Sequence, residues 1–393
     1  MPETGPIHIL FLSRWYPSRV DPMSGLFIQK QAEALAATHR VTVVHVQPDP
    51  CCQDAFETEL ATEKNVGVIR VYYRLRKSTF FGTAIFGNLV RYILAWRKGI
   101  RLIRKMRIDI VHAHILTRTG VIGYWLARRS GKPLILSEHW SRYFPEQDWF
   151  NGWFRRSLTR FIFARAHAVI AVSEKLKQAM QSHRLHNSNW HIVPNIVEPG
   201  LFFPETDSGP LPGKCIVHVS CFNEKSKNIS GFLEAVQLVR QNRTDFHCLL
   251  VGEGPDLDQV KRKAEDLGLT RDCVEFTGMK TGNDLAAIYR KAGFTVISSR
   301  FETFGTVVIE SIACGTPVVS TAVGIAPEIV SEKNGILVQS HDPRALGEAI
   351  SQMIDRCSRF DRADVSGTVG KRFTPESVGR QLTEVYLSLI QSG

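Results

Sequence analysis

The sequence lacks the cysteine spacings, apolar runs and leader that mark secreted, zinc-binding or membrane-spanning proteins. None of its 8 cysteines belongs to a C-x-x-C pair or stands near another Cys or His at metal-ligand spacing, so we expect reduced thiols and no structural zinc site. No stretch approaches the roughly 18 apolar residues that a membrane span requires. The short apolar run at 7–12 has no basic leader and no cleavage site, which argues against a signal peptide. These absences predict a cytoplasmic protein.

Acidic residues are missing from a long part of the N-terminal half. None occurs between Glu63 and Asp109, where 12 Lys and Arg residues stand. Residues 1–200 carry 28 Lys and Arg against 14 Asp and Glu, whereas the rest of the chain carries 21 against 24, so the formal net charge of +11 comes from the first half. Such a basic block needs a polyanion, an anionic membrane surface or simply water as its partner.

The basic block contains a predicted amphipathic helix over residues 83–106. Two interpretations stay open. The helix belongs to the core and has a solvated polar face, or it lies against anionic lipid headgroups at the inner face of the membrane. The pattern rests on apolar residues that recur at steps of three and four, with basic residues between them: Phe86, Leu89, Ile93, Trp96, Ile100 and Ile103.

The length and the order of elements predict two α/β domains. A chain of 393 residues is too long for one small core. Short apolar runs alternate with helical patterns twice along it, which is typical of parallel sheets covered by helices on both faces. A segment rich in Pro and Gly at 198–213 is the predicted linker. We expect domains at 1–197 and 198–374 with a cleft between their strand ends, and a final helix, 375–393, that packs back on the N-terminal domain.

Candidate site residues of the first domain follow predicted strands. Gly25 opens a helix after the strand at 7–13, at the edge where doubly wound folds bind ligands, although a plain turn at a helix start explains the same glycine. His114 and His139 end two further strands, which should deliver both to one sheet edge. Either histidine could be structural, but we expect at least one to be functional and favour His139.

Two glutamates of the second domain form the central candidate. Glu302 stands in a loop with Gly305, and Glu310 lies eight positions later in an apolar helix that ends at Gly315. If that helix begins near Thr306, Glu310 lies one turn in and faces the same opening as Glu302. Backbone amides at the helix start favour an anion or a hydroxyl acceptor. The arrangement suits a polyhydroxylated, phosphate-bearing ligand, whereas a capped surface helix with a solvated glutamate is the alternative.

Together these motifs resemble the retaining nucleotide-sugar glycosyltransferases of family 4 (glycosyl transferases group 1), which have the GT-B fold of two Rossmann-like domains facing across a cleft. The resemblance covers nearly the whole chain. Its most specific signal is the glutamate pair followed by Ala313-Cys314-Gly315-Thr316-Pro317. Weaker motifs add to it: Ser24-Gly25-Leu26-Phe27, Asp109-Ile110-Val111-His112-Ala113-His114, Val172-Ser173, Val193-Pro194-Asn195, Val251-Gly252-Glu253-Gly254-Pro255 and Gly324-Ile325-Ala326-Pro327-Glu328.

The resemblance implies a role for each matching residue. Glu302 would meet hydroxyls of the donor sugar, and Glu310 would accept hydrogen bonds from the ribose hydroxyls. His139 would touch the transferring sugar. The remaining donor contacts that the resemblance implies are Gly25, Gly252, Phe304, Gly305 and Thr306.

One departure from the family pattern affects the diphosphate. The family usually has an Arg just after the first strand of the second domain and a Lys about five residues later, both on the diphosphate. Here Cys221 or a neighbour stands where the Arg is expected. We assign the phosphate to Lys227, with Lys225 as the second choice. A lysine is a point charge and lacks the bidentate fork of an arginine.

The resemblance implies a hexosyltransferase that moves a sugar, with retention, from a nucleoside diphosphate sugar to a hydroxyl of a glycan or lipid-linked acceptor, in surface polysaccharide or glycolipid synthesis. It implies no metal, no cofactor beyond the donor and no covalent nucleophile. The rival enzyme is a sugar-nucleotide hydrolase or epimerase on the same fold. A nucleic-acid-binding protein is the remote alternative, because the basic half has no recognisable nucleic-acid motif. We expect acceptor contacts in the loops at 48–63 and 143–153.

Overall fold

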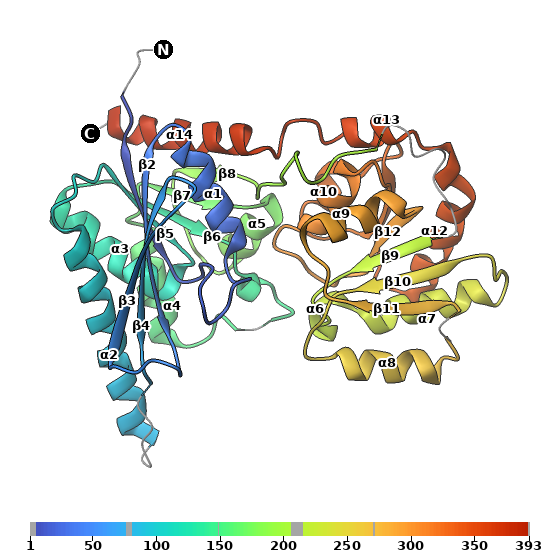
Figure 1. Cartoon of the computed structure of the whole chain (residues 1–393), viewed down its shortest axis with the longest axis horizontal. Helices are drawn as coiled ribbons and strands as arrows, with labels where there is room; N and C mark the ends of the chain where they lie inside the picture. The colour runs from blue at the N-terminus through green and yellow to red at the C-terminus, as the bar shows by residue number, and fades with distance from the viewer. Residues whose placement is uncertain (1–4, 76–80, 148, 206–214, 270–271, 392–393) are drawn as a thin grey trace. The chain divides into compact units, whose positions relative to one another are not determined.

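The computed structural model describes residues 5–75, 81–147, 149–205, 215–269 and 272–391. Contacts within the chain divide it into two compact units (Figure 1). Unit 1 comprises Met1–Val172, Lys177–Ile196 and Pro375–Gly393, and unit 2 comprises Ser173–Leu176 and Val197–Thr374. This division differs from the predicted boundaries at residue 197 and at 173–176. Residues 206–213 of the predicted linker lie outside the described residues.

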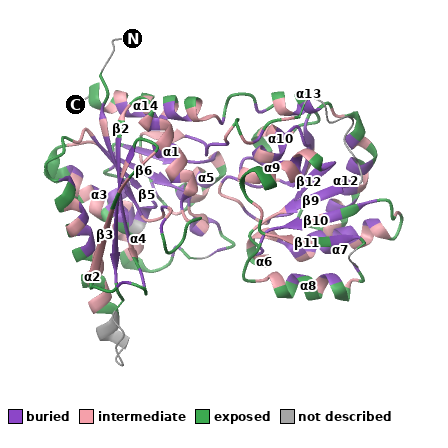
Figure 2. Ribbon diagram, viewed as in Figure 1, coloured by how far each residue is buried: buried purple, intermediate pink, exposed green. Residues whose placement is uncertain are grey.

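Unit 1 is built on an 8-stranded sheet with the order β3-β4-β2-β1-β5-β6-β7-β8. All neighbours are parallel except the edge strand β3, which runs antiparallel to β4. The central strands are buried on both faces (Figure 2), which explains their continuous apolar runs. The strands are β1 (His8–Ser13), β2 (Arg40–Pro48), β3 (Phe56–Glu63), β4 (Val66–Tyr73), β5 (Ile110–His114), β6 (Leu134–Glu138), β7 (Ala168–Ala171) and β8 (Trp190–Ile192).

Helices cover both faces of this sheet. Phe11 and Val43 share one apolar cluster with residues of α1 and α14. The next residue on each strand faces the other way, so Leu12 lies against α3 and Val44 against α2. Among the described residues, no helix is long and apolar enough to cross a membrane. The helices are α1 (Leu26–Ala36), α2 (Phe81–Ile103), α3 (Leu116–Ser130), the 3₁₀ helix η1 (Ser141–Tyr143), α4 (Trp153–Phe163), α5 (Glu174–Ser182) and α14 (Pro375–Gln391).

Unit 2 repeats the design with a 6-stranded parallel sheet of order β11-β10-β9-β12-β13-β14. The sheets of the two units confirm the predicted α/β class with two Rossmann-like domains. The strands are β9 (Cys215–Val219), β10 (His247–Val251), β11 (Val274–Gly278), β12 (Phe294–Ile297), β13 (Val318–Thr321) and β14 (Gly335–Val338). The helices are α6 (Glu224–Lys227), α7 (Ile229–Arg240), α8 (Leu257–Asp266), α9 (Gly282–Lys291), α10 (Thr306–Ala313), α11 (Ala326–Ile329), α12 (Pro343–Arg356), η2 (Cys357–Arg359) and α13 (Arg362–Gly367).

Strand β3 corrects one prediction. The segment 48–63 was expected to be a loop, but its second half pairs with the whole of β4. Glutamates within β3 contact basic side chains, since Arg70 binds Glu59 and Glu63 at 2.9 and 2.7 Å. The strand was missed because an edge strand that is half covered needs little apolar sequence.

The packing of α14 on α1 should contribute measurably to the stability of unit 1. Leu382 is fully buried in the cluster that includes Ile28 and Leu35. We expect Leu382→Ala to lower the free energy of unfolding by about 2–5 kcal/mol, because it leaves a cavity in a close-packed core. Urea denaturation followed by circular dichroism would measure the change. The matched control is Glu384→Ala, two positions later on the opposite, exposed face of the same helix; an equal loss in both variants would contradict the assigned packing.

Candidate active site

Both sheets reverse their strand order at one point, and the predicted site residues of each unit lie there. In unit 2 the chain continues from β9 to β10 on one side and from β12 to β13 on the other. Doubly wound folds bind ligands at the carboxyl ends of the strands at such a switch point. The short helix α6 follows β9 and carries Lys227, while the loop after β12 carries Glu302. Strands β9 and β12 are parallel neighbours, so the two loops start side by side.

Lys227 and Glu302 form an ion pair at this point. The Nζ atom of Lys227 lies 2.5 Å from Oε1 of Glu302, and the two side chains are only 18% and 16% exposed. Ser299 Oγ donates a hydrogen bond to the same carboxylate oxygen at 2.8 Å. Burial is the largest single influence and would lower the pKa of Lys227, but the charge of Glu302, the nearby Cys221 and the hydrogen bond to Glu302 together raise the pKa above its ordinary value. Lys227 is therefore held as a cation.

The residues around Lys227 differ in their surroundings. Lys225 is exposed, and Cys221, which stands near the usual family arginine, is exposed as well. Arg300 lies beside the same helix, where its Nη1 donates to the carbonyl oxygen of Glu224 at 2.8 Å. This guanidinium was not predicted, because the family pattern places the arginine after β9. The signal was present as the residue two positions before Glu302.

The start of α10 has the backbone geometry that the sequence predicted. Gly305 has a φ of +86°, in the left-handed region that favours glycine, and α10 begins at Thr306. Phe304 is held by a hydrogen bond from the amide of Ile325 to its carbonyl oxygen at 2.7 Å. Gly324 permits this approach, because a Cβ there would lie 2.3 Å from the same oxygen. The first amides of α10 thus sit close to Glu302 in a closely packed turn.

Glu310 lies one turn into α10 and has a partner that the sequence did not reveal. Tyr289 on α9 donates its hydroxyl hydrogen to Oε2 of Glu310 at 3.3 Å. Burial, with the nearby Glu310 charge, raises the pKa of Tyr289 well above its ordinary value, so the phenol remains a donor. This contact orients the carboxylate, which suits an acceptor of hydrogen bonds from a diol.

Close packing of the backbone explains why glycine stands at position 252. It follows β10 with a φ of +132°, and a Cβ at this position would lie 1.9 Å from the carbonyl oxygen of Ser220. Only glycine allows the loops after β9 and β10 to approach so closely. The assignment of Gly252 to the donor stays a prediction.

Unit 1 has its switch point between β1 and β5, and Gly25 begins a helix after β1. Gly25 has a φ of +71°, and a Cβ there would lie 2.2 Å from the carbonyl oxygen of Trp15. The loop therefore folds tightly against the N-terminus of α1. Phe27, in the first turn of α1, packs on His139 with ring centroids 4.5 Å apart, so the structure brings the predicted glycine and histidine to the same end of the sheet.

Three buried histidines form a stack beside Phe27. The ring centroids of His112 and His114 lie 4.1 Å apart, and those of His114 and His139 lie 5.9 Å apart. Burial lowers the pKa of both His112 and His139 to about 3 and that of His114 well below its ordinary value. His112 contacts Tyr386 of α14 through Nδ1 at 2.8 Å. The ring nitrogens of His114 and His139 have no hydrogen-bond partner among the described residues.

Glu138 lies next to His139 and holds its backbone in place, a contact that was not predicted. This buried carboxylate accepts hydrogen bonds from the backbone N–H groups of His139 at 2.9 Å and Trp140 at 3.0 Å. Its other oxygen accepts one from the hydroxyl of Tyr143 at 2.9 Å. An acid at the end of an apolar strand, next to the histidine, was the signal in the sequence.

Two family models match the chain, one on each half. The family described as "Glycosyltransferase Family 4" matches residues 25–201, and the one described as "Glycosyl transferases group 1" matches residues 213–356.

Named relatives are similar over most of their length. A D-inositol 3-phosphate glycosyltransferase of Catenulispora acidiphila is 31% identical over 316 residues, which cover 72% of this chain and 73% of the relative. An alpha-monoglucosyldiacylglycerol synthase of Streptococcus pneumoniae is 24% identical over 314 residues, covering 75% of this chain and 70% of the relative.

Solved structures share the fold. Sucrose-phosphate synthase of Thermosynechococcus elongatus superposes with a TM-score of 0.76 at 21% identity, over 98% of this chain and 100% of that one. HepE of Anabaena, solved in complex with UDP-glucose, superposes with a TM-score of 0.72 at 18% identity, over 98% and 100% of the two chains.

The histidine stack should make stability depend on pH in a defined window. A histidine with a pKa of about 3 when folded and near 6.5 when unfolded binds more protons in the unfolded chain, so stability is lost as pH falls below about 6.5. We expect His139→Asn to make the slope of unfolding free energy against pH shallower between about pH 6 and pH 4, by at most about 1.4 kcal/mol per pH unit.

Urea denaturation at several pH values would measure both slopes. The exposed His186→Asn variant is the control for removing an imidazole from the surface of the same unit. Equal slopes in the parent protein and the His139→Asn variant would show that His139 is not held neutral by burial.

Proposed function

Since the chain belongs to glycosyltransferase family 4, the glycosyl transferases group 1 with the GT-B fold, we propose that it transfers a sugar from a nucleoside diphosphate sugar to an acceptor hydroxyl with retention of the anomeric configuration. The observation that carries the proposal is the ion pair of Lys227 and Glu302, 2.5 Å long and largely buried at the switch point of unit 2. A cation and a carboxylate side by side match a donor that has a diphosphate joined to a polyhydroxylated ring.

When the donor binds, its groups replace the contact between Lys227 and Glu302. Its diphosphate takes the ammonium of Lys227, and hydroxyls of its sugar donate hydrogen bonds to Glu302 in place of the lysine. Glu310, oriented by Tyr289, accepts hydrogen bonds from the ribose hydroxyls. The first amides of α10, at Gly305 and Thr306, face negative charge on the donor. Arg300 beside α6 is a second cation for the diphosphate, in the absence of an arginine at Cys221.

The transfer step needs no protein nucleophile. A bond forms between the acceptor oxygen and the anomeric carbon on the face from which the diphosphate departs, and the bond from that carbon to the diphosphate oxygen breaks. The acceptor proton passes to the departing diphosphate. Lys227 and the amides stabilise the charge that develops on the leaving group, which is the main source of rate acceleration in such sites. His139 contributes a neutral ring because burial lowers its pKa to about 3.

The acceptor that we propose is a hydroxyl of a glycan or a lipid-linked glycan. The pneumococcal relative is named for a glycolipid product, and the relative from Catenulispora is named for an inositol phosphate acceptor. The complex of HepE with UDP-glucose makes UDP-sugars the first donors to test.

Activity and stereochemistry are tested by incubating the enzyme with UDP-, GDP- and dTDP-sugars, with and without acceptor glycans and glycolipids. Proton NMR of the product gives its anomeric configuration. Retention and acceptor-dependent release of nucleoside diphosphate support the proposal. Donor hydrolysis without acceptor, or conversion of one donor sugar into another, would instead identify a hydrolase or an epimerase. We propose a metal-independent reaction, so turnover should be unchanged by EDTA.

Removal of the side chain of either member of the ion pair should slow catalysis strongly without unfolding the chain. We expect Glu302→Ala and Lys227→Ala each to lower kcat by about 100-fold or more, because each deletes a contact that is made with the departing group or its sugar. Steady-state kinetics would measure kcat, with circular dichroism as the check on folding. The matched controls are the exposed residues Glu348→Ala and Lys371→Ala of the same unit; undiminished turnover in Glu302→Ala would overturn the site assignment.

The Glu310→Gln variant should separate donor binding from chemistry. A charged acceptor of hydrogen bonds from the ribose stabilises the bound donor equally in the ground state and in the transition state. Its loss should therefore raise the KM for the donor roughly tenfold and leave kcat within about twofold. Kinetics with varied donor concentration give both constants. A fall in kcat at unchanged KM would place Glu310 at the reacting centre instead.

A further inference from the structure

One face of unit 1 consists of three helices without a single acidic residue. Helices α2, α3 and α4 contain 10 Lys and Arg residues and no Asp or Glu. We call it the acid-free face. The helices adjoin one another through aromatic contacts: Arg118 of α3 lies over the ring of Tyr92 of α2 at 5.3 Å, and Tyr124 of α3 packs on Phe161 of α4 with centroids 5.6 Å apart.

Large apolar side chains are exposed on the same face. Phe86 and Leu89 on α2 are 69% and 49% exposed, and Trp125 on α3 is 51% exposed. At the start of α4, Trp153 and Phe154 are 81% and 71% exposed. Burial in the core accounts only for the C-terminal half of α2, where the apolar face packs on the sheet. It does not account for the first half, where Phe86, Leu89 and Ile93 are exposed although the core interpretation would place them in the same buried stripe.

A groove of about 830 Å³ runs between α2 and α3 on this face. Its floor is apolar and includes Trp96, Ile103 and Leu126. Its basic residues include Arg97, Arg101, Arg104, Arg107 and Arg129, and no carboxylate is among the described residues that line it. The nearest acid in sequence, Asp109, is held by the backbone N–H of His8 at 3.0 Å and by Lys132 at 3.8 Å.

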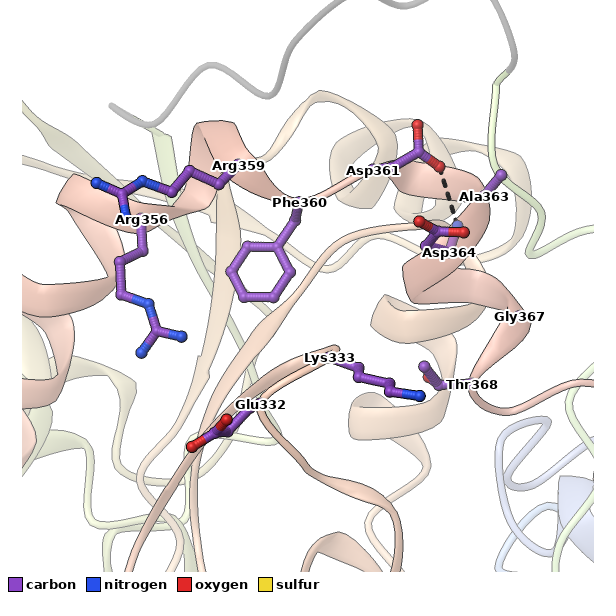
Figure 3. Close-up of a pocket in the computed structure, with 10 residues that line it drawn as sticks. All are labelled: Glu332, Lys333, Arg356, Arg359, Phe360, Asp361, Ala363, Asp364, Gly367 and Thr368. Atoms are coloured by element: carbon purple, nitrogen blue, oxygen red, sulfur yellow. Dashed lines mark hydrogen bonds between the residues drawn. The ribbon is translucent and has the colours of Figure 1, made fainter.

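A pocket of unit 2 differs from this groove in the charges that line it. Unit 2 has an open pocket of about 760 Å³ around η2 and α13 (Figure 3). Basic side chains such as Lys333 and Arg359 line it together with Glu332, Asp361 and Asp364. Charges of both signs are therefore mixed there, whereas the groove of the acid-free face has charges of one sign over an apolar floor.

We propose that the acid-free face docks on an anionic lipid bilayer, with the arginines of the groove on lipid phosphates and its apolar floor against the start of an acyl chain. The argument is charge complementarity combined with amphipathicity: basic side chains attract anionic headgroups, and Trp, Phe and Leu partition into the interface. A nucleic-acid duplex would match the charge, but its bases are stacked on one another, so it would leave the exposed Phe86, Leu89 and Trp153 without a partner. A membrane surface satisfies both.

The test uses the full chain and sedimentation with phosphatidylcholine vesicles that contain or lack about 30 mol% phosphatidylglycerol. We expect binding to the anionic vesicles, a loss of binding near 0.5 M salt, about threefold the physiological concentration, and a blue shift of tryptophan fluorescence on binding. A triple reversal, Arg97→Glu with Arg101→Glu and Arg104→Glu, should weaken partitioning by about 100-fold or more, because each surface charge contributes about fivefold.

The matched control reverses the same number of charges in unit 2: Lys333→Glu with Arg359→Glu and Lys371→Glu. These residues are exposed and lie off the acid-free face, so this variant should retain nearly full binding. A second variant, Phe86→Ser with Trp153→Ser, keeps every charge and should also weaken binding. Circular dichroism checks that each variant is folded.

Four results would overturn the proposal. They are equal binding to neutral and anionic vesicles, equal loss of binding in the two charge-reversed variants, equally tight binding to duplex DNA and to the vesicles, and self-association through this face with no vesicle binding.

Discussion

The contact of Lys227 with Glu302 depends on the parallel pairing of β9 with β12. Thr295 on β12 pairs with Val217 on β9, so the chain leaves both strands at the same edge and the two loops start together. An ion pair that is mostly buried gains little net stability, because desolvation of both charges offsets their attraction. Its value lies in chemistry: the pair keeps an ammonium and a carboxylate where a ligand with a diphosphate and hydroxyls satisfies both at once.

The switch point of unit 1 is built differently. It carries a helix N-terminus at Gly25 and a stack of histidines that burial keeps neutral. The hydrogen bonds of His112 to Ser137 at 2.7 Å and to Tyr386 at 2.8 Å tie the stack to β6 and to α14. The C-terminal helix therefore supports the histidines as well as the core of unit 1.

The fold and most candidate residues could be predicted because local patterns determine them. Apolar runs alternating with helices indicate parallel sheets, and Gly305 marks the turn before α10. The contacts could not be predicted: Lys227 and Glu302 are 75 positions apart, and their approach depends on strand order, which alternation does not specify. The contact of Tyr289 with Glu310 was missed because it joins two helices, whereas the partners of Glu138 are local and its place next to His139 was a signal in the sequence. Strand β3 was missed because glutamates paired with Arg19 and Arg70 look like a polar loop.

Helix α2 shows a deeper limit of sequence analysis. A period of 3.6 residues is the same whether an apolar stripe faces a protein core or a lipid interface, so the sequence left both interpretations open for the whole helix. In the structure only part of the apolar stripe faces the core. Ala95, Trp96 and Ile103 are buried, whereas Phe86 and Leu89 are exposed. The absence of acids then has a physical reason. A core helix requires only a polar outer face, which can carry charges of either sign, whereas three adjacent helices without an acid form a positively charged surface that attracts negative charge.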